Sequence, residues 1–262
     1  MELEVISRLP AGEPRPTPLL FVHGAWHGAW CWDDHFLPYF AEHGYAAHAL
    51  SLRGHGKSPG RERLRWTRLL EYVEDVAQVA ATLPAPPVII GHSMGGGVTQ
   101  RYLEKYPAKG GILLAALPPH GAWGATWRTL RRQPLDFMLV NLKLSLYPLL
   151  RTLDRARHAL FSHDAPAGCV GDCFERLQDE SYVAYLDMLL FARPRPKRVN
   201  KPALVLGAEK DALFGPNEVR ATARAYGTEA IIFPNMAHDM MLEEGWEEVA
   251  GRMLAWLQAQ GW

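Results

Sequence analysis

Hydrophobic residues along the chain alternate between short continuous runs and longer amphipathic segments. Six short apolar runs end in glycine or a polar residue, as strands buried on both faces of a parallel sheet often do. They lie within residues 18–24, 46–56, 87–93, 110–117, 202–211 and 229–236. Between them, residues 67–83 place apolar side chains on one helical face and leave an outer face with Glu71, Glu74, Asp75 and Gln78. Further helices are predicted at about 98–106 and 243–260. This alternation predicts an α/β fold with a mostly parallel sheet and helices on both faces.

One segment interrupts this alternation, because from about Pro118 to Pro196 the chain shows mainly helical signals. Apolar residues recur there at helical spacing, at Leu135, Met138, Leu139, Leu142, Leu146 and Leu149. The stretch SLYPLL also alternates weakly, so a strand remains an alternative at that point. Prolines mark both boundaries of the segment. We therefore expect residues 118–196 to form a helical cap, inserted into a core domain made of residues 1–117 and 197–262.

The composition narrows the class of protein. The 262 residues include 28 Lys or Arg and 28 Asp or Glu, and this zero net charge indicates neither nucleic acid nor an anionic membrane as a partner. No apolar run reaches the roughly 18 residues of a transmembrane helix, and the opening residues lack the apolar core of a secretory signal. The three cysteines, Cys31, Cys169 and Cys173, are expected to be free thiols in a reducing cytoplasm. Two cysteines four positions apart do not by themselves predict a metal site.

A strand-like run passes directly into the motif Gly91-His92-Ser93-Met94-Gly95, and a helical pattern follows it. The bare G-x-S-x-G pattern is weak evidence, but its position between strand and helix is typical of a nucleophile held at a sharp corner. A serine at such a corner has a strained backbone, and flanking glycines relieve the crowding. The positive end of the helix dipole favours negative charge developing there. We therefore predict that Ser93 is a nucleophile.

A serine hydroxyl needs a base, and the acid and the histidine are expected after the serine, each beyond the end of a strand. His238 and Asp211 each follow a predicted strand in that order, so we predict them as base and acid. Glu209 and Asp187 remain alternatives for the acid. Asp239 is poorly placed to reach back to the ring of its neighbour His238.

Attack by the serine creates an oxyanion, which two backbone N–H groups should meet. One is predicted at Met94, directly after the serine. The other is predicted in the loop HGAWHGAW, at Ala25, with Trp26 as the alternative. His23 and His27 of that loop are interpreted as structural residues that anchor it by hydrogen bonds.

Five motifs then occur in one order: FVHGAWHG from Phe21, LRGHGKS from Leu52, GHSMGG from Gly91, GAEKD from Gly207 and MAH from Met236. Together they resemble the α/β-hydrolase superfamily across nearly the whole chain. The resemblance implies an eight-stranded, mostly parallel sheet with a helical cap after the sixth strand. It also implies a Ser-Asp-His triad and no metal or organic cofactor.

Two finer resemblances concern the reaction. The stretch HGAWHGAWCW resembles plant methylesterases and the related hydroxynitrile lyases, and GHSMGG with RGHGxS resembles lysophospholipase-like and monoglyceride-lipase-like members. A lysine commonly follows the catalytic histidine in the lyases, whereas Asp239 stands at that place here. Haloalkane dehalogenases and epoxide hydrolases carry an aspartate where this chain has Ser93. Ester hydrolysis is therefore the reaction that the resemblance favours.

The predicted cap is rich in leucine, methionine and aromatic residues, which indicates an apolar wall above the serine. The predicted pocket residues are Trp26, Trp123, Trp127, Phe137, Met138 and Met188. The arginines of the cap are expected on its solvated face. The sequence thus predicts hydrolysis of a small carboxylic ester with a lipophilic acyl or aromatic part. Acyl transfer by the same triad, or ligand reception without turnover, are the alternatives.

Overall fold

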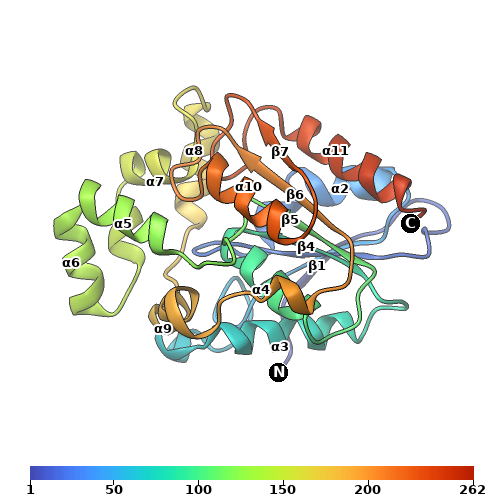
Figure 1. Cartoon of the computed structure of the whole chain (residues 1–262), viewed down its shortest axis with the longest axis horizontal. Coiled ribbons are helices and arrows are strands. Elements are labelled where there is room, and N and C mark those ends of the chain that lie inside the picture. Colours follow the sequence, from blue (N-terminus) through green and yellow to red (C-terminus); the bar gives the residue numbers. More distant parts are fainter.

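The computed structural model describes all residues from 1 to 262. Its centre is a seven-stranded sheet with the order β1-β3-β2-β4-β5-β6-β7 (Figure 1). Only the edge pair β1 and β3 is antiparallel, and all other neighbouring strands are parallel. The strands are β1 Val5–Arg8, β2 Leu19–Val22, β3 Ala47–Leu50, β4 Val88–His92, β5 Gly110–Leu114, β6 Ala203–Ala208 and β7 Ala230–Phe233.

The six strands predicted from apolar runs are all present, as β2 to β7, and the α/β class is confirmed. The sheet has seven strands rather than the eight that the resemblance implies, so the cap follows the fifth strand instead of the sixth. Only β1 precedes β2, because residues 9–18 contain four prolines. Proline lacks the N–H donor that a further paired strand would need.

Helices cover both faces of the sheet, as predicted (Figure 1). One face carries α3 (Leu69–Ala80), α4 (Ser93–Leu103) and α10 (Pro216–Ala225); the other carries α1 (Trp30–Asp33), α2 (Phe36–Glu42) and α11 (Trp246–Ala259). The central strands β2, β4, β5 and β6 are buried along their whole length, and all four residues of β2 have 0% exposure. This two-sided burial is the physical reason for the continuous apolar runs.

The prediction for α3 is wrong at Asp75 on the outer face and at Leu70, which is 43% exposed although the pattern predicts it on the apolar face. Asp75 is buried rather than on the outer face, because the guanidinium of Arg53, from the loop after β3, lies 2.7 Å from its carboxylate. A buried carboxylate is tolerated when an opposite charge and hydrogen bonds satisfy it. The short helix η1 (Arg61–Trp66) lies in the same loop.

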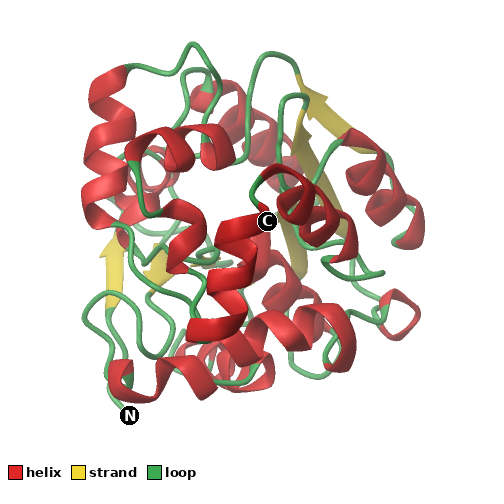
Figure 2. Cartoon of the chain, turned by 90° about the vertical axis from the view of Figure 1, so that its left-hand side faces the viewer, coloured by secondary structure: helices red, strands yellow, loops and turns green.

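Between β5 and β6 the chain forms only helices and loops. They are α5 (Trp123–Arg132), α6 (Pro134–Lys143), η2 (Tyr147–Leu150), α7 (Leu153–Leu160), α8 (Ala167–Arg176), α9 (Tyr182–Leu186), the π-helical turn η3 (Asp187–Phe191) and η4 (Pro196–Arg198). The stretch SLYPLL contains η2, so the strand alternative is wrong there. Figure 1 shows α5 and α6 farthest from the sheet, at the left. Seen from that side, helices surround the ends of the strands (Figure 2).

None of the helices is both long and apolar enough to cross a bilayer.

Candidate active site

Strand β4 passes into helix α4 without a connecting residue, and Ser93 is the first residue of the helix. The backbone of Ser93 has φ +53°, a strained value for a residue with a side chain. A side chain at Gly91 would collide with the backbone of Gly95, and one at Gly95 would collide with the carbonyl of His23. The glycines of the motif are thus required by close backbone packing, as the sequence predicts.

Three predicted residues meet beyond the carboxyl ends of β4, β6 and β7. Nε2 of His238 lies 2.8 Å from Oγ of Ser93, and Nδ1 of the same ring lies 2.8 Å from Oδ2 of Asp211. The other carboxylate oxygen of Asp211 accepts hydrogen bonds from the amides of Leu213 and Phe214. These bonds fix the carboxylate, which in turn orients the imidazole toward the serine.

The protonation of the ring follows from its partners. A carboxylate only accepts hydrogen bonds, so Nδ1 of His238 carries the hydrogen and Nε2 is free to accept the Ser93 hydroxyl. Burial on its own lowers the pKa of His238. The carboxylate of Asp211, through its charge and hydrogen bond, and the charge of Asp239 outweigh burial and hold the pKa above its ordinary value. The ring is thus arranged as a base for Ser93.

The two alternative acids lie elsewhere. Glu209 is exposed and accepts the amide of Asn235. Asp187 is buried in the cap and pairs with the guanidinium of Arg68 at 2.6 Å. Neither carboxylate contacts the ring of His238, which leaves Asp211 as its acid partner.

The predicted oxyanion donors lie beside the serine. Ala25, Trp26 and Met94 line the same pocket as Ser93. Met94 is in the first turn of α4, where backbone N–H groups have no acceptor within the helix. The neighbouring Trp26 has φ +68°, so the loop makes a tight left-handed turn at this point.

His23 and His27 anchor this loop, as predicted. His23 donates from Nδ1 to the carbonyl of Gly24 and accepts the amide of Leu52 at Nε2, 3.0 Å away. His27 donates from Nδ1 to the carbonyl of Ala25 over 2.8 Å. Both rings are buried and bind backbone atoms, which holds the loop against the site.

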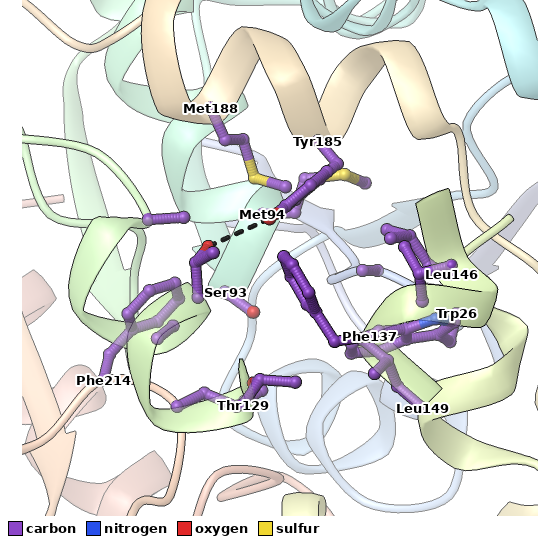
Figure 3. Close-up of a pocket in the computed structure, with 16 residues that line it drawn as sticks. Trp26, Ser93, Met94, Thr129, Phe137, Leu146, Leu149, Tyr185, Met188 and Phe214 are labelled. Carbon is purple, nitrogen blue, oxygen red and sulfur yellow. Dashed lines mark hydrogen bonds between the residues drawn. The ribbon is translucent and has the colours of Figure 1, made fainter. Parts of the chain in front are cut away.

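A mostly apolar pocket opens above Ser93, with about 640 Å³ of empty space including its mouth. Its walls come from the loop after β2, from the start of α4, from cap helices and from the loop after β6. They are Ala25, Trp26, Ser93, Met94, Ala122, Ala125, Thr126, Thr129, Phe137, Val140, Leu146, Leu149, Tyr185, Met188, Leu213 and Phe214 (Figure 3). No charged side chain lines it, so the pocket suits an uncharged, lipophilic group.

The structure brings three of the six predicted pocket residues to the pocket: Trp26, Phe137 and Met188. The prediction is wrong for Trp123, Trp127 and Met138, which are 49%, 58% and 51% exposed. The reason is which side of each helix faces the pocket. Helix α5 turns Ala125, Thr126 and Thr129 inward, and α6 turns Phe137 and Val140 inward, so the neighbouring positions face outward.

A model described as "Alpha/beta hydrolase family" matches residues 19–252. The chain belongs to this family. It is 36% identical over 106 residues to Methylesterase 10 of Arabidopsis thaliana, covering 38% of each chain. It is 34% identical over 116 residues to the Bifunctional esterase/perhydrolase DCH of Acinetobacter calcoaceticus, covering 40% of this chain and 39% of that one. The matched stretches therefore span about two fifths of these relatives.

The fold of this α/β hydrolase is similar to that of a thermophilic esterase from Thermogutta terrifontis. The TM-score is 0.73, with 20% identity, over 98% of this chain and 93% of the other. At this identity the similarity shows a shared fold.

Sequence reasoning missed a buried polar network behind the base. Nε2 of His27 lies 3.0 Å from Oδ2 of Asp239, and Nε2 of His92 donates to the carbonyl of His238 over 2.9 Å. Burial first, and then the nearby charge of His238, lower the pKa of His92 to about 3, so this ring is neutral. The second histidine of HGAWHGAW and the acid after His238 were the only local signals of the network.

One buried cluster offers three metal-ligating atoms. His27, Cys173 and Asp239 hold their ligand atoms within 4.8 Å of one another. His27 and Asp239 are already hydrogen-bonded to each other. Burial first, and then the charge of Asp239, raise the pKa of the Cys173 thiol. Metal binding needs the thiolate, so these surroundings favour the hydrogen-bonded pair and a neutral thiol.

Proposed function

We propose that this α/β hydrolase cleaves carboxylic esters through an acyl-serine intermediate. The observation that carries the proposal is the continuous hydrogen-bond chain from Oγ of Ser93 through the ring of His238 to the carboxylate of Asp211, each step 2.8 Å long. A base-activated serine with an oriented imidazole is the arrangement that acyl transfer requires.

The first half of the reaction forms the intermediate. Oγ of Ser93 attacks the ester carbonyl carbon while its proton passes to Nε2 of His238. The tetrahedral intermediate collapses, the bond to the alcohol oxygen breaks, and His238 returns the proton to that oxygen. The negative oxygen of the intermediate would be held by the amides of Met94 and Ala25, each contributing about 3 kcal/mol.

Water completes the cycle. It attacks the acyl carbon while His238 takes one of its protons, and the bond from the acyl carbon to Ser93 then breaks. The carboxylic acid leaves and the serine regains its proton. Asp211 keeps the ring in the required tautomer and stabilises the imidazolium that forms twice in the cycle.

The pocket supports the substrate class. Its lining is mostly apolar and uncharged, with Phe137, Met188 and Phe214 among the larger side chains. A lipophilic acyl chain or an aromatic part of an ester would lose its water shell there, which favours binding. The names of the relatives, a methylesterase and an esterase/perhydrolase, agree with an ester as the substrate.

The test uses a fluorophosphonate probe and a p-nitrophenyl butyrate assay on the same preparations. The parent protein should be labelled and active, and Ser93→Ala should lose both. Ser7→Ala, an exposed serine far from the site in sequence, is the matched control and should keep both. Persistent labelling of Ser93→Ala would assign the nucleophile to another residue, and a parent protein that neither labels nor turns over would indicate a receptor.

Product analysis distinguishes hydrolysis from the alternative reaction, acyl transfer to an alcohol. In a water–alcohol mixture, a hydrolase releases mainly the acid, whereas an acyltransferase releases mainly the new ester.

A further inference from the structure

The outer side of the two leading cap helices is apolar. Leu135, Met138 and Leu142 lie at positions i, i+3 and i+7 of α6 and are 71%, 51% and 72% exposed. Trp123 and Trp127 on the adjacent α5 are also exposed. We call these five residues the outer cap face. Soluble proteins seldom expose so many large apolar side chains on adjoining helices unless the surface binds a partner.

Positive charge accompanies these apolar residues. Arg131, Arg132 and Lys143 are exposed on the same two helices, whose only acid, Asp136, is buried. The carboxylate of Asp136 is occupied within the cap by the guanidinium groups of two arginines on α7 and the turn before it. The exposed charges of α5 and α6 are therefore all positive.

A surface groove beside Leu135 carries charges of both signs. Its lining contains Arg132, Arg151, Arg155 and His158 together with Asp136 and Asp154, so three arginines meet two carboxylates. Across residues 118–160 there are seven basic residues, Arg128, Arg131, Arg132, Lys143, Arg151, Arg155 and Arg157, and only two acids, Asp136 and Asp154. The whole chain carries 28 basic and 28 acidic residues, so its zero net charge does not reveal the excess of basic residues in this part of the cap.

From this combination we propose that the outer cap face is a docking surface for a lipid layer with anionic head groups. The apolar side chains of this face would enter the interface, and the exposed arginines and lysine of the same two helices would meet lipid phosphates. A second copy of the chain fits less well, because self-pairing would bring the same positive groups together. Figure 1 shows α5 and α6 projecting at one end of the molecule, where an extended surface can reach them.

The same helices join this surface to the pocket. The inner side of α6 presents Phe137 and Val140 to the pocket above Ser93, while Leu135 and Leu142 face outward. Docking would thus place the pocket walls next to the lipid layer. The proposal itself stands on the exposed residues and their charge, independently of the reaction at Ser93.

Vesicle flotation tests the proposal, with vesicles of phosphatidylcholine alone and of phosphatidylcholine mixed with phosphatidylglycerol. We expect the protein to float with the anionic vesicles and to lose most binding at 1 M salt, where charge attraction is screened within about 3 Å. The double variant Leu135→Ser/Leu142→Ser should bind about tenfold more weakly. Leu9→Ser, at an exposed leucine outside the cap, is the matched control and should bind like the parent protein.

A second pair of variants tests the charges. Arg132→Gln/Lys143→Gln should reduce binding to anionic vesicles several-fold and leave the fold unchanged, because both side chains are exposed. Hydrolysis of soluble p-nitrophenyl butyrate should be the same in all these variants, so a failure of docking and a failure of the proposed reaction remain distinguishable.

Three results would overturn the proposal. The first is that the parent protein stays with neither vesicle, and the second is that the leucine variant floats as well as the parent. The third is a concentration-dependent dimer in sedimentation that the leucine variant abolishes, which would assign the face to a second copy of the chain.

Discussion

Nε2 of His27 lies 3.0 Å from Oδ2 of Asp239, although 212 positions separate the two residues. Both side chains are buried, and Nδ1 of His27 also faces an acceptor, the carbonyl of Ala25. Nε2 of the ring thus faces a carboxylate oxygen and Nδ1 faces a backbone carbonyl, so oxygen atoms hold the imidazole at both ends. The pair joins the loop after β2 to the residue next to His238, and so connects two parts of the candidate active site.

Asp239→Asn should lower the free energy of unfolding at pH 7 by about 3 kcal/mol, because it removes the carboxylate from a buried hydrogen-bonded pair. Urea unfolding measures this. The matched control is Asp34→Asn, because Asp34 forms a half-exposed ion pair with Arg176. This substitution should lower the free energy of unfolding by less than about 1 kcal/mol. Equal losses in the two variants would contradict a special role for the buried pair.

The loss of unfolding free energy in Asp239→Asn should depend on pH. Burial alone raises the pKa of Asp239, but the hydrogen bond and electrostatic interaction with His27, together with the nearby rings of His92 and His238, hold the pKa below its ordinary value of 3.8. A carboxyl group with a lowered folded-state pKa stabilises the fold above its unfolded pKa and loses that contribution as the pH falls through the folded pKa. The stability difference between the parent and Asp239→Asn should therefore be full at neutral pH and shrink below about pH 4. A difference that grew on acidification would contradict this assignment.

Asp211→Asn should reduce kcat for p-nitrophenyl butyrate by about 10⁴-fold, the loss seen when the acid of a protease triad is replaced in this way. The amide cannot hold the ring of His238 in the tautomer that accepts the serine proton. Glu209→Gln is the matched control and should stay close to the parent, since its carboxylate contacts Asn235 instead. A larger loss in the control would transfer the role of the acid to Glu209.

The rise of kcat/KM on the acid side of its pH profile should follow the deprotonation of His238. Hydrolysis requires the neutral ring, so kcat/KM should rise with pH through a pKa above 6.5. Asp239→Asn removes one of the negative charges that raise this pKa, so its acid limb should move to lower pH. Asp34→Asn should leave the profile in place, and an unmoved profile in Asp239→Asn would show that its charge does not reach the ring.

Esters of longer acids should be better substrates than acetate. Each methylene buried in the pocket contributes at most about 0.8 kcal/mol, or about fourfold in kcat/KM. Phe137→Ala should weaken this gain because Phe137 lines the pocket, while Trp127→Ala should not, since Trp127 faces solvent. A strict preference for p-nitrophenyl acetate would contradict an apolar acyl site.

The elements and the central residues of the candidate site could be predicted from the sequence alone. Strands buried on both faces appear as continuous apolar runs, and the corner at Ser93 demands glycines within two positions on either side. Asp211 and His238 could be predicted because the carboxyl ends of parallel strands meet at one edge of a sheet. These features depend on neighbours along the chain or on a general property of parallel sheets.

Only the tertiary structure decided which contacts form between distant segments. It paired His27 with Asp239, buried Asp75 against Arg53, and turned Trp127 and Met138 to the outside of the cap. Periodicity shows that a helix is amphipathic, but a cap helix with apolar residues on two sides does not indicate which side faces the pocket. That choice depends on how whole elements pack together, and local sequence patterns do not contain this information.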